Sequence, residues 1–521
     1  MKNRDLAAAW AYHDGTRHSY QSIRANRHYL DWENQPIPFK IYAELEPIPL
    51  PQRLSSAGMS GLEAISVPHT PAERQVIPSI QSLAEILYLS AGITKRRSYP
   101  GGEMLFRAAA CTGALYHIDL YLVCGSLPDL EAGVYHFSPQ DFALRRLREG
   151  DYRAVVVHAS GEETSIAHAP CVIVCASTFW RNAWKYQARA YRHCYWDNGT
   201  ILANLLAATA ARKLPANVVI GFGDVTIHQL LGLENKREAP LSLVALGHAH
   251  SQAVASLPSV EPATFETVPL SKKEVGYPAM RAMHEASSLE TEEEIKTWRE
   301  EAKQSVGGRK DEGGKQERMF PLQPLGEEET PRDTIEEVIQ RRGSTREFSR
   351  ASIAFAQLST MLDRATRGIP ADFLSMTGES LNELYLIVHA VDELPSGAYV
   401  LRRDERALEL LKEGDFRREA GYLGLGQEIP ADCSVNVYFL ADLNRALECF
   451  GNRGYRAAQL EASITGGKLY LAAYALGLGA SGLTFFDDDV TEFFSPHAAG
   501  KSVMFLIALG KSARKKGLNV I

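Results

Sequence analysis

A short segment in the second half of the chain concentrates positive charge around a hydroxyl group. Arg341, Arg342 and Arg346 surround Ser344 at the start of a stretch with helical character. A phosphate dianion needs fixed cations and hydrogen-bond donors, so this segment predicts a phosphate-binding site. Taken alone, the same arginines are equally compatible with a solvated surface. Two basic residues after the last expected strand are predicted to close on the same phosphate: Lys511 and Arg514.

A glycine-rich segment follows a long apolar stretch near the end of the chain. Glycine lets the backbone approach a flat ring closely, so we expect Gly479–Thr484 to border such a ring. A plain helix C-cap at Gly477 or Gly479 is the alternative, and both interpretations can hold together.

The elements that must position these residues occur twice. A shift of 264 positions aligns the two halves without a gap, and five matches in one register exceed chance. The chain is therefore predicted to contain two copies of one unit. The matches are Asp119–Leu122 with Glu383–Leu386, Gly133–Tyr135 with Gly397–Tyr399, Glu149–Arg153 with Glu413–Arg417, Arg189–Arg192 with Arg453–Arg456, and Asp224 with Asp488.

Each copy has the pattern of an α+β unit, with short β-rich runs between amphipathic helices. The stretches Asn198–Ala211 and Ala462–Leu476 are apolar nearly all round, which indicates burial against a large surface. We expect two α/β sandwich halves that form an intramolecular pseudo-dimer. An N-terminal arm with no partner in the repeat is expected to lie extended on the surface. The expected division is arm 1–60, first half 61–250, linker 251–330 and second half 331–521.

Composition excludes several classes of protein. The net charge of -7 over 521 residues implies no general attraction to nucleic acid or anionic membranes. The polar start lacks a signal-peptide core, and the apolar stretch Lys468–Phe486 is broken by glycines, so a cytoplasmic protein is expected. Seven scattered cysteines predict reduced thiols and no metal site.

The order of the motifs resembles the nitroreductase superfamily of flavoproteins. After the arginine segment come Gly454–Arg456, Leu476–Gly482 and Asp487–Val490, in the order of that family. The resemblance implies nitroreductase-like halves and identifies the phosphate as that of FMN. In the family, a backbone N–H of the glycine-rich loop faces flavin N5, which makes Gly482 and Thr484 the candidates here.

The first half is similar to the SagB-type dehydrogenases, which include thiazole- and oxazole-forming oxidases. It carries Thr112–Tyr116 before a strand, and Lys185 with Tyr186 before Arg189–Arg192. Because that branch needs its Lys-Tyr pair for activity, the resemblance implies catalytic roles for both residues. A desolvated lysine suits a base, and tyrosine suits a proton donor or relay. By itself, the pair is typical of the start of an amphipathic helix.

The resemblance also implies a loop that reaches the flavin bound mainly by the partner subunit. The family usually has Pro-Ser-Ala-Gly-Ala-Leu-Tyr-Pro there, whereas this chain has Ala110 for the first Pro, Cys111 for the Ser and His117 for the last Pro. The residues that the resemblance places beside the flavin are Arg107, Cys111, Thr112, Gly113 and Ala114.

We therefore expect an FMN-dependent dehydrogenase or oxidase that moves a hydride between flavin N5 and a small organic or peptide-borne heterocycle. Oxygen would take the electrons. The alternatives are an NAD(P)H-dependent nitro or quinone reductase and a non-catalytic flavin-binding or storage protein. The partner is expected to be a small-molecule or modified-peptide substrate.

The uneven distribution of the motifs predicts one FMN per chain. The second half holds the phosphate residues, and the first half holds the loop and the Lys-Tyr pair. The positions expected to be degenerate in the other site are Ser66–His69 and His248, opposite the phosphate group, and Thr377–Ser380 and Cys449–Phe450, opposite the loop and the pair.

Overall fold

The computed structural model describes residues 2–66, 74–99, 102–234, 236–252, 257–305, 318–374 and 380–513. Several positions named above lie outside this part of the chain, namely Arg514, Val67–His69 and Thr377–Glu379.

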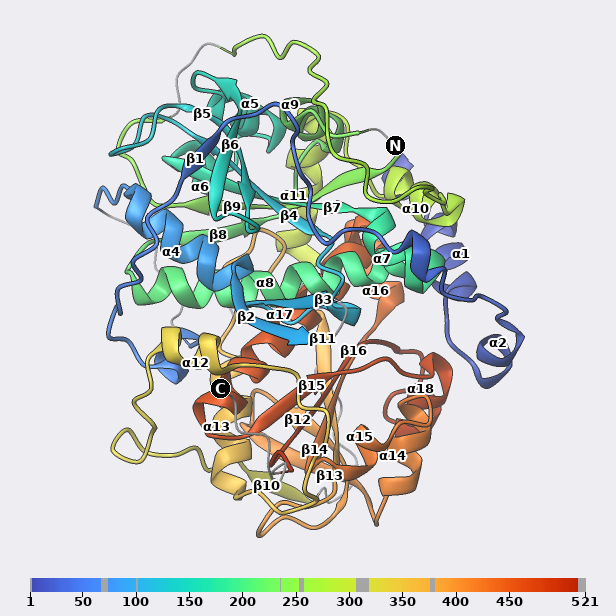
Figure 1. Cartoon of the computed structure of the whole chain (residues 1–521). Helices are drawn as coiled ribbons and strands as arrows, with labels where there is room; N and C mark the ends of the chain where they lie inside the picture. The colour runs from blue at the N-terminus through green and yellow to red at the C-terminus, as the bar shows by residue number, and fades with distance from the viewer. Residues whose placement is uncertain are drawn as a thin grey trace.

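Two seven-stranded antiparallel sheets form the core of the molecule, one in each half (Figure 1). Their strand orders are β1-β6-β5-β4-β7-β9-β8 and β10-β13-β12-β11-β14-β16-β15, so the second sheet repeats the topology of the first. The first sheet contains β1 (Pro47–Pro49), β4 (Ile118–Cys124), β5 (Gly133–Ser138), β6 (Ala143–Glu149), β7 (Cys171–Thr178), β8 (Ala216–Val219) and β9 (Glu238–Leu246). The second contains β10 (Met319–Pro321), β11 (Asn382–Val388), β12 (Gly397–Arg402), β13 (Ala407–Glu413), β14 (Val435–Ala441), β15 (Gly479–Gly482) and β16 (Ser502–Gly510).

The helices repeat in the same order as the strands. Those of the first half are α3 (Gly61–Ala64), α4 (Ile80–Ala91), α5 (Arg153–Ala159), α6 (Thr164–Ala167), α7 (Phe179–Tyr186), α8 (Ala190–Ala211) and α9 (Asp224–Leu231). Their counterparts are α12 (Ile335–Arg341), α13 (Phe355–Ala365), α14 (Arg417–Leu423), α15 (Glu428–Asp432), α16 (Leu443–Phe450), α17 (Arg453–Ala475) and α18 (Asp487–Phe494).

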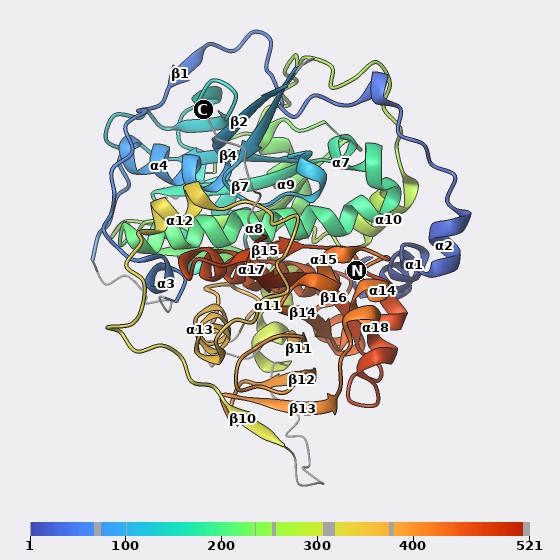
Figure 2. The same ribbon diagram turned by 60° about the horizontal axis from the view of Figure 1, so that its bottom comes forward.

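The long helices α8 and α17 lie side by side between the two sheets (Figures 1 and 2). Trp196 on α8 donates its indole N–H to Gln459 Oε1 at 2.5 Å, and a Cβ added at Gly199 would lie 1.9 Å from Ser463 Oγ. Glycine is thus required for this close approach. The all-round apolarity of both stretches is explained by burial between the sheets, and the predicted fold of two α+β halves in a pseudo-dimer is confirmed.

Crossed ion pairs join the halves. Arg192 of the first half is 2.5 Å from Asp487 of the second, and Arg456 of the second is 2.6 Å from Asp224 of the first. All four side chains are buried. The pairing makes Asp487, and not Asp488, the counterpart of Asp224. The ungapped register was therefore wrong at its end, because the connection after α17 is one residue shorter than that after α8.

The N-terminal arm does have a counterpart in the repeat. After a short 3-10 helix at Lys2–Arg4 it forms α1 (Ala7–Gly15), which corresponds to α10 (Pro278–Ala286) in the segment between the halves. Thr16 Oγ1 accepts a hydrogen bond from Arg192, as Ser287 Oγ does from Arg456. The expectation that the arm has no partner in the repeat was wrong, because these buried contacts do not require a similar sequence. The part around Pro47 and Pro49 is extended, as expected, and forms β1. We call residues 7–18 the first strap and residues 278–289 the second strap.

Some elements occur in one copy only. The hairpin of β2 (Ile93–Tyr99) and β3 (Gly102–Arg107) belongs to the first half, and it has no counterpart among the described residues of the second half. The other elements that follow the straps are α2 (Tyr20–Ala25) and α11 (Glu292–Ser305). None of the described helices combines the length and apolarity that crossing a membrane requires.

Candidate active site

The predicted phosphate segment lies at the edge of the second sheet, where β15 begins and β16 ends. The Thr345 N–H donates to Ala480 O at 2.8 Å, and the Ser349 N–H donates to Lys511 O at 2.9 Å. Phe348 forms a bridge with Ser512. The fold therefore brings the segment that contains Ser344 and Arg346 to the same sheet edge as Lys511.

Arg342 crosses from the second half to the first. Its buried guanidinium donates to the carbonyl oxygens of Ala108, at 2.8 Å, and Arg107, at 3.2 Å. Lys95 crosses in the other direction and donates to the carbonyl oxygens of Arg341 and Arg342, at 3.0 and 2.8 Å. Each half thus places a cation on the backbone of the other.

Uncompensated positive charge gathers at this junction. Among the described residues, no carboxylate forms an ion pair with Lys95, Arg342, Arg346 or Lys511. Burial and the nearby guanidinium groups of Arg342 and Arg97 lower the pKa of Lys95. Cations that repel one another at a partly buried site fit a bound anion. Lys95 was missed from the sequence, because only the tertiary structure brings the hairpin to Arg342.

Arg341 does not join this group. Its guanidinium forms an ion pair with Asp333 at 2.7 Å and donates to Tyr474 O at 2.8 Å, and the side chain is exposed.

The two candidate backbone donors of the glycine-rich segment differ in their partners. The Gly482 N–H already donates to the hydroxyl of Tyr470. The Thr484 N–H has no hydrogen-bond acceptor in the part of the chain that the structure describes. Thr484 is therefore the available donor.

His18, at the end of the first strap, contacts the side chain of Thr484. Its Nδ1 lies 3.2 Å from Thr484 Oγ1, and its backbone N–H donates to Asp487 at 2.8 Å. Burial and the charge of Arg189 lower the pKa of His18 to about 3, so the imidazole is neutral at pH 7. No sequence motif marks this residue, because the strap carries none.

The loop of the first half is fixed by an acidic residue on α8. Asp197 accepts hydrogen bonds from Cys111 Sγ at 3.1 Å, from the N–H and the hydroxyl of Thr112 at 2.8 and 2.7 Å, and from His117 Nε2 at 2.9 Å. Gly113 and Ala114 have positive φ angles of 65° and 54°. The left-handed turn thus has an anchor that the sequence did not reveal, although an isolated aspartate in an apolar helix is a usable signal.

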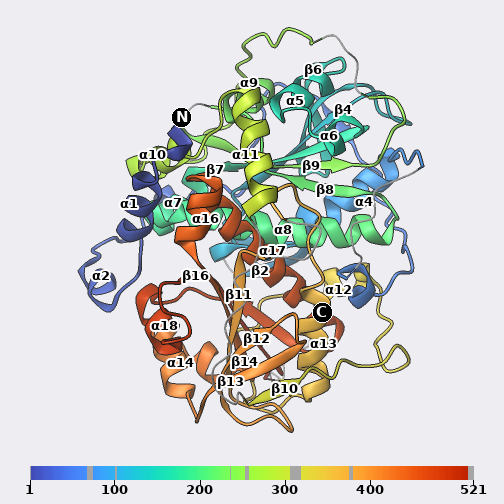
Figure 3. The ribbon, with the colours of Figure 1, turned by 180° about the vertical axis from the view of Figure 1, so that it is seen from behind.

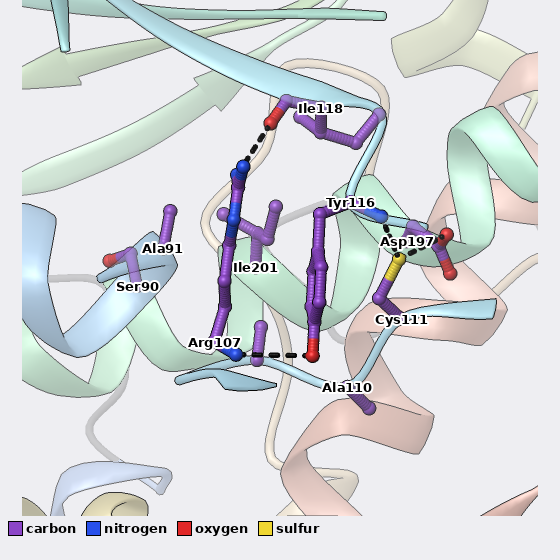
Figure 4. A pocket seen from close by; sticks show the side chains of 10 residues that line it. Ser90, Ala91, Arg107, Ala110, Cys111, Tyr116, Ile118, Asp197 and Ile201 are labelled. Carbon is purple, nitrogen blue, oxygen red and sulfur yellow. Dashed lines mark hydrogen bonds between the residues drawn. The ribbon is translucent and has the colours of Figure 1, made fainter. Parts of the chain in front are cut away.

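Arg107 supports the loop from a small cavity beside it (Figure 4). Its guanidinium stacks on the ring of Tyr116, 5.1 Å from the centroid, and donates to Pro38 O at 2.5 Å. Its backbone N–H donates to the hydroxyl of Tyr116 at 3.1 Å. The Arg107 side chain is therefore bound to Pro38 and Tyr116, and its backbone carbonyl oxygen accepts the hydrogen bond from Arg342.

Lys185 and Tyr186 end α7 beside the same loop. A Cβ added at Gly113 would lie 2.8 Å from Tyr186 Oη, so the hydroxyl packs against this glycine and leaves no room for a side chain. The Tyr186 ring packs edge-on against His193, with centroids 4.6 Å apart, and Lys185 Nζ lies 5.3 Å from the Tyr186 ring centroid. Neither polar group has a hydrogen-bond partner among the described residues.

Tyr186 also lies within electrostatic reach of the phosphate segment. Burial, Asp197 and Cys111 raise the pKa of Tyr186, and Arg346 of the other half opposes the shift. The hydroxyl is therefore protonated at neutral pH. The junction combines cations without anions, a free backbone N–H and a lysine-tyrosine pair, which together suit a planar, phosphate-bearing ligand and proton transfer next to it.

The family comparison matches both halves. The model described as "Nitroreductase family" covers residues 112–248 and 339–511, together more than half of the chain. A crystal structure of a presumed nitroreductase from Anabaena variabilis superposes with a TM-score of 0.76 at 25% identity, and the match covers 97% of this chain and 99% of that one.

Two curated proteins match parts of the chain. The first is a presumed nitroreductase of Methanocaldococcus jannaschii, MJ1384, with 24% identity over 169 residues, which are 32% of this chain and 80% of that protein. The second is the microcin B17-processing protein McbC of Escherichia coli, with 26% identity over 157 residues, 29% of this chain and 54% of that protein. Because the family model matches both halves in the repeat that the fold displays, this chain belongs to the nitroreductase family.

Proposed function

We propose that the chain is an FMN-dependent oxidoreductase that moves a hydride between flavin N5 and a small organic or peptide-borne heterocycle. The observation that carries the proposal is the junction itself. The uncompensated cations Arg342, Arg346 and Lys511 belong to the second half, and Tyr186 on Gly113 belongs to the first.

The residues at the junction fit FMN. The phosphate would be held by Arg342, Arg346, Lys511 and the Ser344 hydroxyl, since a dianion requires fixed cations and donors. Lys95 adds a further cation from the first half. The Thr484 N–H would face the ring, and the left-handed turn at Gly113 allows the backbone to approach it closely.

When bound, FMN supplies hydride transfer at N5. The chain's own groups would handle the protons. Tyr186, kept protonated by burial, would donate a hydrogen bond to the substrate. Lys185, on the same turn and not paired with an acid in the described residues, would accept the proton that leaves the substrate. The neutral imidazole of His18 would act indirectly, through its hydrogen bond with the hydroxyl of Thr484.

The choice of a heterocyclic substrate is supported by the match to McbC, whose name describes processing of microcin B17. The Lys-Tyr pair is present only in the first half, because Cys449 and Phe450 occupy the corresponding end of α16. A nitro or quinone reductase that uses NAD(P)H is the competing function, in line with the match to MJ1384.

Steady-state assays on FMN-saturated protein test the proposal. An azoline-bearing peptide incubated in air should lose two hydrogen atoms, as detected by mass spectrometry, without any nicotinamide. Rapid oxidation of NAD(P)H with a nitroaromatic acceptor would instead establish the competing function. Bound flavin that no donor reduces would identify a storage protein.

A further inference from the structure

The junction between the halves occurs a second time, with the roles of the halves exchanged. Because β15 corresponds to β8, Gly221 takes the place of Thr484. Because α16 corresponds to α7, Phe450 takes the place of Tyr186. The ring contacts agree, since Arg453 lies over Phe222 just as Arg189 lies over Phe485.

The indole of Trp298, on α11, fills the space between these two counterparts. Its N–H donates to Phe450 O at 2.9 Å, and its ring centroid lies 5.6 Å from that of Phe450. A Cβ added at Gly221 would lie 2.8 Å from Trp298 Cζ3. The side chain is 1% exposed. A flat ring of the protein thus lies between Gly221 and Phe450, the counterparts of Thr484 and Tyr186.

The polar groups of the second junction are also satisfied from within the chain. The backbone N–H groups of Ile220 and Gly221 each donate to the carboxylate of Asp372 at 2.9 Å. Arg299, next to Trp298, donates to Gly221 O at 2.9 Å and to Ser160 O at 2.7 Å, and lies 3.5 Å from Asp372. The N–H of Gly221, which corresponds to the free N–H of Thr484, therefore already has an acceptor.

The chain takes a different path after each strap, and this difference explains why only the second junction is filled by the protein. Each ends in the same way, since Asp487 bonds the backbone of His18 through both its N–H and its carboxylate, and Asp224 bonds Leu289 likewise. After His18 the chain runs outward over α7, where His28 Nε2 lies 2.9 Å from Trp184 O. After Leu289 it turns inward as α11, which stands against α16 and between the halves (Figure 3).

We propose that α11 is an internal ligand of the second junction, with the Trp298 indole in the position that corresponds to the flavin ring of the first. This rests on the proposed function, because the first junction defines where the ring lies. It follows that the chain has one flavin site and that residues 278–305, within the expected linker, hold the two halves together.

Hydrogen-deuterium exchange on the full chain, with and without saturating FMN, tests the proposal. We expect exchange in residues 481–486 to slow when FMN is added. Exchange in residues 218–223 should be slow in both states, because Asp372 and Trp298 hold that backbone without FMN. Absorbance of the saturated protein should give one flavin per chain.

The outcomes separate the two proposals. Fast exchange in residues 218–223 that slows with FMN, or two tightly bound flavins per chain, would overturn the internal-ligand proposal. No response in residues 481–486 would overturn the proposed function, and slow exchange in residues 218–223 would then still report the packing of α11.

Discussion

At the first junction, the Thr484 N–H and the Tyr186 hydroxyl have no partner among the described residues, and several cations lack an anion. At the second junction, Gly221 and Phe450 hold the indole of Trp298, and a carboxylate caps the backbone donors. Both junctions are built from corresponding strands, helices and straps of the repeat. Thr484 and Tyr186 are half-buried and Arg346 and Lys511 are exposed, so their free polar groups are accessible to a ligand, whereas the counterparts at the second junction are already engaged. On the two proposals above, one duplicated frame serves ligand binding at one junction and cohesion of the halves at the other.

The largest difference between the junctions is expected in turnover. Lys185→Ala should lower the turnover number by roughly 10²–10⁴-fold, as removal of a general acid or base does, and leave FMN bound. The matched variant at the other junction is Cys449→Ala, which should turn over like the wild type. Steady-state kinetics with parallel flavin quantification measures both. Equal losses in the two variants would mean that the junctions are not functionally distinct.

Removal of the internal ligand should have the next largest effect. Trp298→Ala should lower the free energy of unfolding by roughly 3–5 kcal/mol, because it deletes a fully buried aromatic side chain and leaves a cavity. Trp32→Ala, at a position 66% exposed, should change it by about 0.5 kcal/mol or less. Thermal and denaturant unfolding provide the comparison. Trp298→Ala with wild-type stability would show that α11 does not hold the halves together.

Cofactor affinity should separate two neighbouring arginines. Arg342→Ala should weaken FMN binding by about 10- to 100-fold, equivalent to about 1.5–3 kcal/mol for a lost charged hydrogen bond. Arg341→Ala should bind FMN within about threefold of the wild type, because its guanidinium is already paired with Asp333. Fluorescence titration of FMN measures both constants. If Arg341→Ala proves to be the weaker binder, the assignment of the phosphate cations is wrong.

The contribution of the first strap should be visible in the pH dependence of stability. In the unfolded chain His18 protonates near its ordinary pKa of 6.5, whereas in the folded protein it stays neutral down to about pH 3. Stability that is present above pH 6.5 is therefore lost as the pH falls toward 3, by about 2 kcal/mol at pH 5 from this residue. His18→Asn should flatten the decline between pH 7 and 5. His250→Asn, at an exposed position, controls for the loss of a histidine, and identical slopes in the two variants would contradict the assignment.

Much of the frame could be predicted from the sequence, because its signals are local. All-round apolarity reports which segments are buried, and it located the two central helices α8 and α17. Charge and glycine placement likewise pointed to Ser344–Arg346 and Gly482–Thr484, which the fold brings to one junction with Tyr186.

What only the tertiary structure decided was which surface covers each buried segment. Asp197, Lys95 and His18 act on residues far away in the sequence, so no local pattern marks them. The two straps make the same backbone contacts but have different side chains. The sequence alone therefore did not show that the repeat includes them. The charged stretch around Trp298 has the composition of a linker, yet Ile295, Trp298 and Arg299 are buried where it packs against both halves. Burial of such a segment depends on the shape of its partner surface, and that shape exists only after both halves have folded.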